Sequence, residues 1–293
     1  MKVRFLCAVY GLAAMLAILT LIPPPALAAS GFSDDADAVE NAANSVFMLE
    51  VYGANSRKIA TGSGFVAFDS STLVTNYHVV EGGAYVVALG DDAEQYVIDS
   101  ACIVDRQLDL AILHFSKPVT AAPLPLQAED QLKRSQRVVA IGSPAGLKNT
   151  VSIGNISGFY NQNGKNWIQF TAPISSGSSG GALLSDDGKV VGITTASYAS
   201  TQNVNLAIRS TSLIALYKRW DGKTFKSLGA VTGGGAASAV SVSTETVSGK
   251  VWVTNGGKKY HSSPTCSKMK NPVEMDLMEA IQNGYEPCGK CFK

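Results

Sequence analysis

Short apolar runs separated by turn residues dominate the chain from about residue 45 to residue 208. The runs are rich in Val and Ile, as in SVFMLEVY (45–52), LAILHF (110–115), QRVVAIG (136–142) and KVVGITT (189–195), and Gly, Asn, Asp or Pro often stands between them. Regularly spaced short strands without intervening helices are typical of barrels and sandwiches. The pattern predicts an all-β domain in two halves, divided by APLPL at 122–126.

The pattern changes after this domain. A helix is predicted over residues 212–220, at the end of a domain that spans residues 29–225. Residues 226–249 consist mostly of Gly, Ala, Ser, Val and Thr, which predicts a flexible linker. Residues 250–293 form a small separate block with a strand-like VWV, an acidic helix-like stretch near 274–281, and three of the five cysteines.

The N-terminal segment resembles a secretory signal. Lys2 and Arg4 precede an apolar run at 5–22, three prolines and then ALAA at 26–29. A basic region, an apolar region and a small-residue site predict cleavage after Ala28, which makes residues 1–28 a signal peptide. The alternative is an uncleaved anchor, because the run is near the short limit for spanning a bilayer. We expect an extracytoplasmic protein, periplasmic or secreted, with no membrane attachment after cleavage; the family resemblance described below implies that it is bacterial.

Composition narrows the function classes. The 293 residues are 46% hydrophobic and 16% charged, and the net charge is +1. The chain can bury a sizeable core, and the near-neutral balance lacks the basic footprint of a nucleic-acid-binding protein. We therefore expect no nucleic-acid partner.

The stretch ISSGSSGGALL at 174–184 has two interpretations. It is either a flexible Gly/Ser loop or a turn that carries a nucleophilic serine, with glycines that let backbone N–H groups approach an oxyanion. A nucleophilic serine needs a base. Of the three histidines, His114 lies inside an apolar strand and His261 in the cysteine-rich block, whereas His78 ends LVTNYH. Asp109 stands before an apolar strand, where a carboxylate needs a partner or an exposed edge.

The blocks LVTNYHVV, DLAIL and GSSGGALL, in that order, resemble the three catalytic blocks of trypsin-like serine proteases, most closely the Deg/HtrA type. The resemblance covers roughly residues 42–212 and implies two six-stranded β-barrels with the site between them. It implies that Ser179 is the nucleophile, His78 the base and Asp109 the residue that orients it. The N–H groups of Gly177 and Ser179 would form the oxyanion hole.

The same resemblance implies an exported serine endopeptidase that acts on polypeptides and needs no cofactor for catalysis. Pro173 and Ile174 would lie at the primary substrate pocket, which favours small or medium apolar residues over Lys or Arg. The chain departs from the family pattern at Ser178, Ala182 and Arg209, and its tail is not of the PDZ type. The alternative function is a catalytically silent, trypsin-like binding or scaffold protein that its C-terminal block directs to a target.

The C-terminal block offers four metal ligands as two pairs: His261 with Cys266, and Cys288 with Cys291. This arrangement resembles a small zinc-binding module of the Ada type, which implies a metal-stabilised α+β module at 250–293. The alternative is a Cys288–Cys291 disulfide or redox pair. Cys102 lies in an apolar strand and is predicted to be a buried small hydrophobe. A role in binding a wall component or a protein partner is an expectation for the module.

Overall fold

In the computed structural model, residues Phe32–Lys293 form one compact unit. The expected signal peptide lies outside the described residues, as do residues 235–249 of the expected linker. Within the described residues, no helix is both long and apolar enough to cross a membrane. The described residues are 31–293 except 91–94, 130, 198–203, 235–249, 255, 262, 267–268, 277–279, 281–282, 284 and 292–293.

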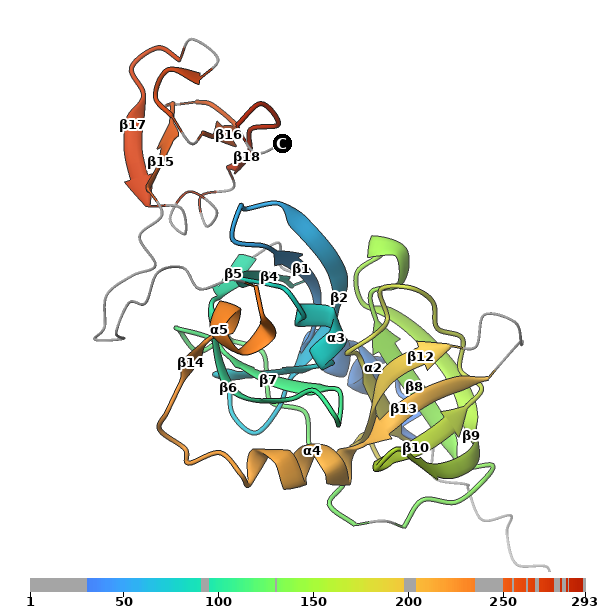
Figure 1. The fold of residues 1–293 in the computed structure, drawn as a ribbon. Helices are drawn as coiled ribbons and strands as arrows, with labels where there is room; N and C mark the ends of the chain where they lie inside the picture. Colours follow the sequence, from blue (N-terminus) through green and yellow to red (C-terminus); the bar gives the residue numbers. More distant parts are fainter. Residues whose placement is uncertain are drawn as a thin grey trace, which may run out of the picture. The chain divides into compact units, whose positions relative to one another are not determined.

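The first half of the molecule is an antiparallel sheet preceded by two short helices (Figure 1). Asp35 caps the second helix, because its carboxylate accepts a hydrogen bond from the Ala38 N–H at 3.0 Å. The helices are η1 (Phe32–Asp34) and α2 (Ala36–Ala43). The strands are β1 (Val46–Tyr52), β2 (Lys58–Val66), β3 (Thr72–Thr75), β4 (Tyr85–Leu89), β5 (Gln95–Ile98), β6 (Ser100–Asp105) and β7 (Leu110–His114), and the short helix α3 (Tyr77–Val80) follows β3.

This first sheet is not the closed six-stranded barrel that the sequence predicted. It is an eight-stranded sheet in the order β14-β6-β7-β3-β2-β1-β4-β5. Only Asp99 separates β5 from β6 in the sequence. The two strands are joined by the chain and not by backbone hydrogen bonds, so the sheet does not close. The free edge of β6 pairs instead with β14 (Lys226–Ser227), and the Asp99 carbonyl accepts the Leu228 N–H at 2.7 Å.

The second half is the closed six-stranded barrel that the sequence predicted, in the order β10-β13-β12-β11-β8-β9. All its strand pairs are antiparallel. Its strands are β8 (Arg137–Gly142), β9 (Thr150–Gln162), β10 (Lys165–Phe170), β11 (Ala182–Ser185), β12 (Val190–Ser197) and β13 (Asn205–Arg209), with a short helix η2 (Pro144–Gly146) after β8.

An apolar core joins the two halves. Phe65 and Val74 of the first sheet belong to the same buried cluster as Ile141 and Leu184 of the barrel, and Leu213 of α4 (Ser210–Tyr217) completes it. Each half also has its own core cluster. The shared cluster gives the elements at the boundary between the halves a common packed support.

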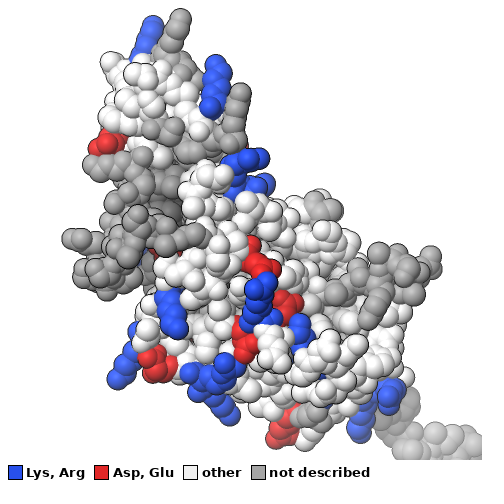
Figure 2. Space-filling model, in the orientation of Figure 1, with Lys and Arg blue, Asp and Glu red and all other residues white. Residues whose placement is uncertain are grey.

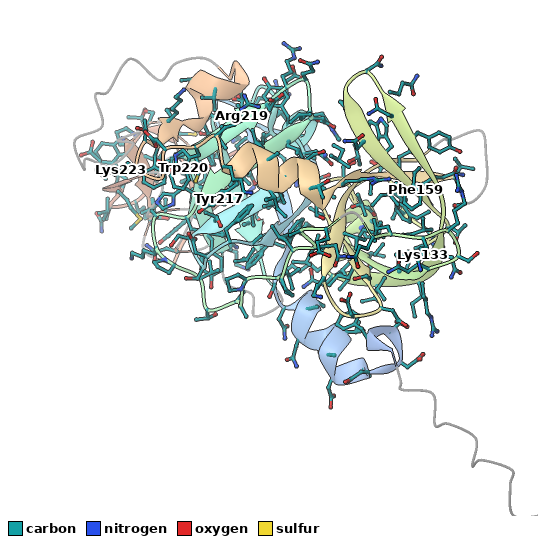
Figure 3. All side chains as sticks on the ribbon, turned by 90° about the horizontal axis from the view of Figure 1, so that it is seen from below. Lys133, Phe159, Tyr217, Arg219, Trp220 and Lys223 are labelled. Atoms are coloured by element: carbon teal, nitrogen blue, oxygen red, sulfur yellow. The ribbon has the colours of Figure 1, made fainter. Side chains whose placement is uncertain are left out.

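The predicted C-terminal helix of this domain begins and ends earlier than expected, at Ser210–Tyr217. Aromatic packing holds it and the turn that follows. Tyr217 stacks on Phe68 with ring centroids 3.7 Å apart, and Trp220 lies 5.4 Å from Phe225 (Figure 3 labels Tyr217 and Trp220). Arg219 also donates to the Asp105 carboxylate at 2.6 Å.

The segment expected to begin the linker is folded. Residues 226–227 form β14, and the next residues form α5 (Leu228–Thr232). Leu228 is fully buried in the core of the first sheet, and the buried Thr232 hydroxyl donates to the Gly83 carbonyl at 2.6 Å. The composition of the segment did not predict this, because only Leu228 and Val231 of the segment pack against the core and the surrounding residues are small or polar.

The C-terminal block contains two small sheets, one of β15 (Lys250–Val253) with β17 (Val273–Asp276) and one of β16 (Lys259–Tyr260) with β18 (Glu286–Pro287). Residues 274–276, expected in a helix, are strand. Val251 and Tyr260 of this block share one apolar cluster with Tyr85 of β4 and Val97 of β5. Tyr260 is 1% exposed, so its ring is a main anchor of that cluster.

Charged side chains of both signs are interspersed on the face drawn in Figure 2. The described residues also include ion pairs, among them Arg106 with Glu81 at 2.7 Å and Lys189 with Asp187 at 2.8 Å. The face therefore shows no broad field of one sign, consistent with the net charge of +1.

Candidate active site

His78 lies on α3, directly after β3. Its ring Nδ1 is 2.9 Å from Oδ2 of Asp109, and its backbone N–H donates to Oδ1 of the same carboxylate at 2.8 Å. The His78 side chain is 45% exposed and that of Asp109 is 13% exposed. One carboxylate thus fixes both the main chain and the ring of His78, and the ring remains accessible to a substrate.

Asp109 stands in a tight turn between β6 and β7, in the left-handed region with φ of 59°. A non-glycine residue rarely adopts this conformation, although Asp tolerates it better than most. The turn is supported by the Asp105 carboxylate, which accepts the Leu108 N–H at 2.9 Å. The reversal places the Asp109 carboxylate next to α3.

Ser179 lies in a turn that ends where β11 begins. Gly177 and Gly180 flank it with φ of 98° and 89°, which favour glycine. A Cβ on Gly180 would lie 2.1 Å from the Ser63 carbonyl oxygen and 2.3 Å from Oγ1 of Thr75. The glycines are required by backbone shape and close approach, so the stretch is a fixed turn and not a linker-like loop.

Ser63 of β2 connects this turn to the first sheet. Its N–H donates to the Ser179 carbonyl at 2.8 Å, and its hydroxyl donates to the Gly177 carbonyl at 2.7 Å. The Thr75 hydroxyl in turn donates to the Ser63 carbonyl at 2.7 Å. Ser63 and Thr75 are fully buried, so these bonds hold the Ser179 turn against the sheet that carries His78.

The two neighbouring serines have different environments. The Ser178 side chain is buried at 3% exposure, and its hydroxyl faces the backbone N–H of Ser175 at 3.4 Å. The Ser179 hydroxyl donates to the Thr195 carbonyl at 2.8 Å. The Ser179 hydroxyl would have to turn away from that carbonyl before it could donate its proton to a base.

The N–H groups of Gly177 and Ser179 donate no hydrogen bond to any described residue, whereas the N–H of Ser178 between them donates to the Ser175 carbonyl at 3.0 Å. Two free donors beside a serine hydroxyl can stabilise a negatively charged oxygen. Pro173 and Ile174 line a cavity of about 10 Å³ with other residues, all of them uncharged.

The four expected metal ligands come together in the C-terminal block. Their candidate ligand atoms all lie within 4.8 Å of one another. The sulfur atoms of Cys266 and Cys288 are 3.9 Å apart, and Sγ of Cys291 is 3.7 Å from Nδ1 of His261. A tetrahedral ion with Zn–S bonds of about 2.3 Å separates its ligands by about 3.8 Å, so the spacing fits zinc.

The protonation of these ligands also suits a metal. Burial acts to raise the pKa of the Cys288 thiol, but the N–H groups of Lys290 and Cys291 and the neighbouring thiols lower it to about 7. Burial, with the charge of Lys259, lowers the pKa of His261 and so favours the neutral imidazole. All three cysteines of the cluster are free thiols.

Sequence reasoning did not single out Ser63, Asn76 or Thr195, although the structure connects each of them to the predicted residues. The Asn76 amide donates to the Asp109 carbonyl at 2.9 Å and to the Thr195 hydroxyl at 3.1 Å. The motifs GSG, TNYH and ITT were visible in the sequence. Their polar residues inside apolar runs were the available signal.

Residues 62–193 match the family described as a trypsin-like peptidase domain. Anti-sigma-I factor RsgI9 of Acetivibrio thermocellus is 36% identical over 170 residues, which are 58% of this chain and 24% of that protein. Mitochondrial serine protease HTRA2 of Bos taurus is 32% identical over 216 residues, which are 68% of this chain and 46% of that protein.

A solved structure, the serine endoprotease from Yersinia pestis, aligns with a TM-score of 0.56 and 25% identity, over 62% of this chain and 64% of that chain. The chain spans less than half the length of the two curated relatives. These similarities show a trypsin-like fold with relatives among the HtrA-type serine proteases.

Replacement of Gly180 with Ala should destabilise the protein by more than the usual cost of a left-handed alanine. The new Cβ would meet the Ser63 carbonyl at 2.1 Å, and we expect a loss of at least about 2 kcal/mol in the free energy of unfolding, measured by urea denaturation. Gly222→Ala is the control, because Gly222 has φ of 74° but no atom within 4 Å of the added Cβ. Equal losses for the two variants would contradict this account of the turn.

Proposed function

We propose that this chain is an exported serine endopeptidase with Ser179 as nucleophile, His78 as base and Asp109 as the residue that orients the base. The observation that carries the proposal is the double attachment of His78 to Asp109, with the Ser179 turn tied to the same sheet through Ser63. The trypsin-like fold and the serine proteases among the relatives support it. Catalysis of this kind needs no cofactor.

In the proposed reaction the Ser179 hydroxyl rotates away from Thr195 and attacks the carbonyl carbon of the scissile peptide bond. His78 accepts the hydroxyl proton and then donates it to the leaving amine. Asp109 keeps the ring oriented and stabilises the imidazolium. Water then hydrolyses the acyl-enzyme by the same steps, with His78 again as the base.

The free N–H groups of Gly177 and Ser179 would stabilise the oxyanion of the tetrahedral intermediate. Loss of one such donor typically costs about 2.7–4 kcal/mol of transition-state stabilisation. The second candidate function, a silent binding or scaffold protein, is less well supported, because such a protein has no need for a paired His78 and Asp109, or for a serine turn with two N–H groups that donate to no described residue.

Ser179→Ala should abolish covalent labelling by a fluorophosphonate probe and cleavage of a casein substrate, because the nucleophile is removed. Ser178→Ala is the matched control and should retain labelling, since the Ser178 side chain is buried. The two serines are adjacent, so this pair also tests the choice of nucleophile. Labelling of Ser179→Ala but not of Ser178→Ala would show that Ser178 is the nucleophile. A wild-type protein that is not labelled would favour the silent scaffold.

We also propose that cleavage follows small or medium apolar residues. Pro173 and Ile174 carry no charge, and the other residues that line their small cavity are uncharged as well, so a substrate side chain that widens this cavity on binding would meet no charged group. A pocket without an acidic side chain has no partner for a buried Lys or Arg. Profiling with a peptide library should therefore show an apolar preference at the residue before the cleaved bond. A strong basic preference would contradict this assignment.

The C-terminal block is proposed to hold one structural zinc ion through His261, Cys266, Cys288 and Cys291. The mutual spacing of the ligand atoms and the three free thiols support this set over a Cys288–Cys291 disulfide. Bound zinc would cross-link strands that have too little core of their own. As part of the same function, we propose that the chain is exported and that residues 1–28 are removed. We also propose that the C-terminal block recognises a wall component or a protein partner.

The purified mature protein should contain about one equivalent of zinc per chain by elemental analysis. Cys288→Ser should lose most of it, whereas Cys102→Ala, in the buried strand β6, should retain it. The ligand thiols bind as thiolates, so acidification should release the ion as they become protonated. A metal-free protein with a Cys288–Cys291 disulfide in its mass spectrum would decide for the alternative.

A further inference from the structure

Asn76 lies where an asparagine usually caps a helix, but its contacts indicate a different role. It is the N-cap residue of α3, where Asn normally accepts a hydrogen bond from a backbone N–H of the first turn. Asn76 makes no such bond. The carboxylate of Asp109 takes that place, because its Oδ1 accepts the His78 N–H at 2.8 Å. Capping of α3 is thus supplied from another strand, and the fully buried Asn76 side chain is free for other contacts.

Both hydrogens of the Asn76 amide are used. Nδ2 lies 2.9 Å from the Asp109 carbonyl oxygen and 3.1 Å from Oγ1 of Thr195. The carbonyl can only accept, and the Thr195 hydroxyl already donates its own hydrogen to the Ile193 carbonyl at 2.9 Å. An amide oxygen in the place of Nδ2 would face two acceptors, so these partners determine the orientation of the amide.

The third polar atom of this amide, Oδ1 of Asn76, is buried without a hydrogen-bond partner among the described residues. An unpaired buried acceptor is unfavourable, and folded proteins contain few of them. Asn76 has this unpaired oxygen in the same orientation in which its two N–H groups bind Asp109 and Thr195. The donors are therefore what this position requires.

Each partner is an irregular backbone position. Asp109 is held in the left-handed region, and a bond to its carbonyl opposes relaxation of that peptide. Thr195 is the extra residue of a β-bulge in β12, where the register shifts between Thr194 and Ala196. Bulges commonly redirect a residue next to an active site, and the carbonyl of Thr195 accepts the Ser179 hydroxyl.

We propose that Asn76 is a positioning residue. Its buried amide binds the Asp109 carbonyl and the Thr195 hydroxyl. These two bonds fix the position of Asp109, in the first half, relative to the β12 bulge, whose Thr195 carbonyl accepts the Ser179 hydroxyl. The inference rests on the proposed peptidase function. It assigns to Asn76 no contact with the substrate, only control of the distance between the His78–Asp109 pair and Ser179.

Steady-state kinetics on a peptide substrate test the proposal. Asn76→Asp keeps the shape but loses both donors, and we expect kcat to fall roughly 10- to 100-fold, as small misplacements of catalytic groups do. KM should stay within about 3-fold, because no substrate-binding group changes. Thr195→Val should reduce kcat in the same direction, whereas Thr195→Ser keeps the hydroxyl and should restore it. Wild-type kcat in both Asn76→Asp and Thr195→Val would overturn the proposal.

A matched control separates positioning from stability. Ser45 is also buried, at 1% exposure, and its hydroxyl donates to the Ala122 carbonyl at 2.7 Å, remote from the site in its contacts. Ser45→Ala should lower the thermal midpoint and leave kcat unchanged. The double variant Asn76→Ala with Thr195→Val should lose less than the product of the losses in the two single variants, since both substitutions remove the same Asn76–Thr195 hydrogen bond. An equal loss of kcat in Ser45→Ala, or strictly multiplicative losses, would count against a positioning role.

A spectroscopic readout distinguishes this inference from the proposed function. The Nδ1 proton of His78, hydrogen-bonded to Asp109, should give a downfield proton NMR resonance that moves or disappears in Asn76→Ala and remains in Ser45→Ala. A wild-type protein that the fluorophosphonate probe does not label would refute the peptidase function, and the resonance would still test Asn76. An unchanged resonance in Asn76→Ala would overturn the inference even in an active enzyme.

Discussion

The hydrogen bonds of Ser63 are the contact on which the arrangement of the site depends. One residue of β2 holds the turn of Ser179 by its N–H and by its hydroxyl, and Thr75 holds the same residue from β3. His78 follows β3 after only two residues. Ser179 and His78 come from different halves of the molecule, but hydrogen bonds and chain connectivity attach both of them to the same two adjacent strands, β2 and β3. The relative position of the two groups thus follows from a short buried network and the packed core beneath it.

This dependence explains why glycines flank Ser179. The turn must approach β2 so closely that a side chain at position 180 has no room, and the backbone must take positive φ on both sides of the serine. A composition rich in Gly and Ser looks the same in a mobile linker and in such a turn. Only the partners that surround the backbone separate the two cases.

Short apolar runs between turn residues are local signals, and they predicted the strand-rich architecture. The closed second barrel and the meeting of His78 with Asp109 were implied by the resemblance of three short motifs to those of trypsin-like proteases. The sequence did not predict the open first sheet, since pairing of β14 with β6 joins residues that are far apart in the chain. It missed β14 and α5 because the one informative residue, Leu228, stands in a Gly-rich and Ser-rich context. Sequence analysis did not identify Asn76 and Thr195, because they form hydrogen bonds between residues far apart in the sequence, which no periodicity encodes.

The pairing of β14 with β6 also sets a time order on folding in the cell. β1 to β7 precede Lys226 and Ser227 in the chain by more than a hundred residues, so in a chain that emerges from its N-terminal end the edge of β6 is at first unpaired. Unpaired strand edges are templates for association with other chains. The nascent first half therefore has an interval of vulnerability that ends only when the last residues of the domain arrive, and a chaperone that covers this edge would act within that interval.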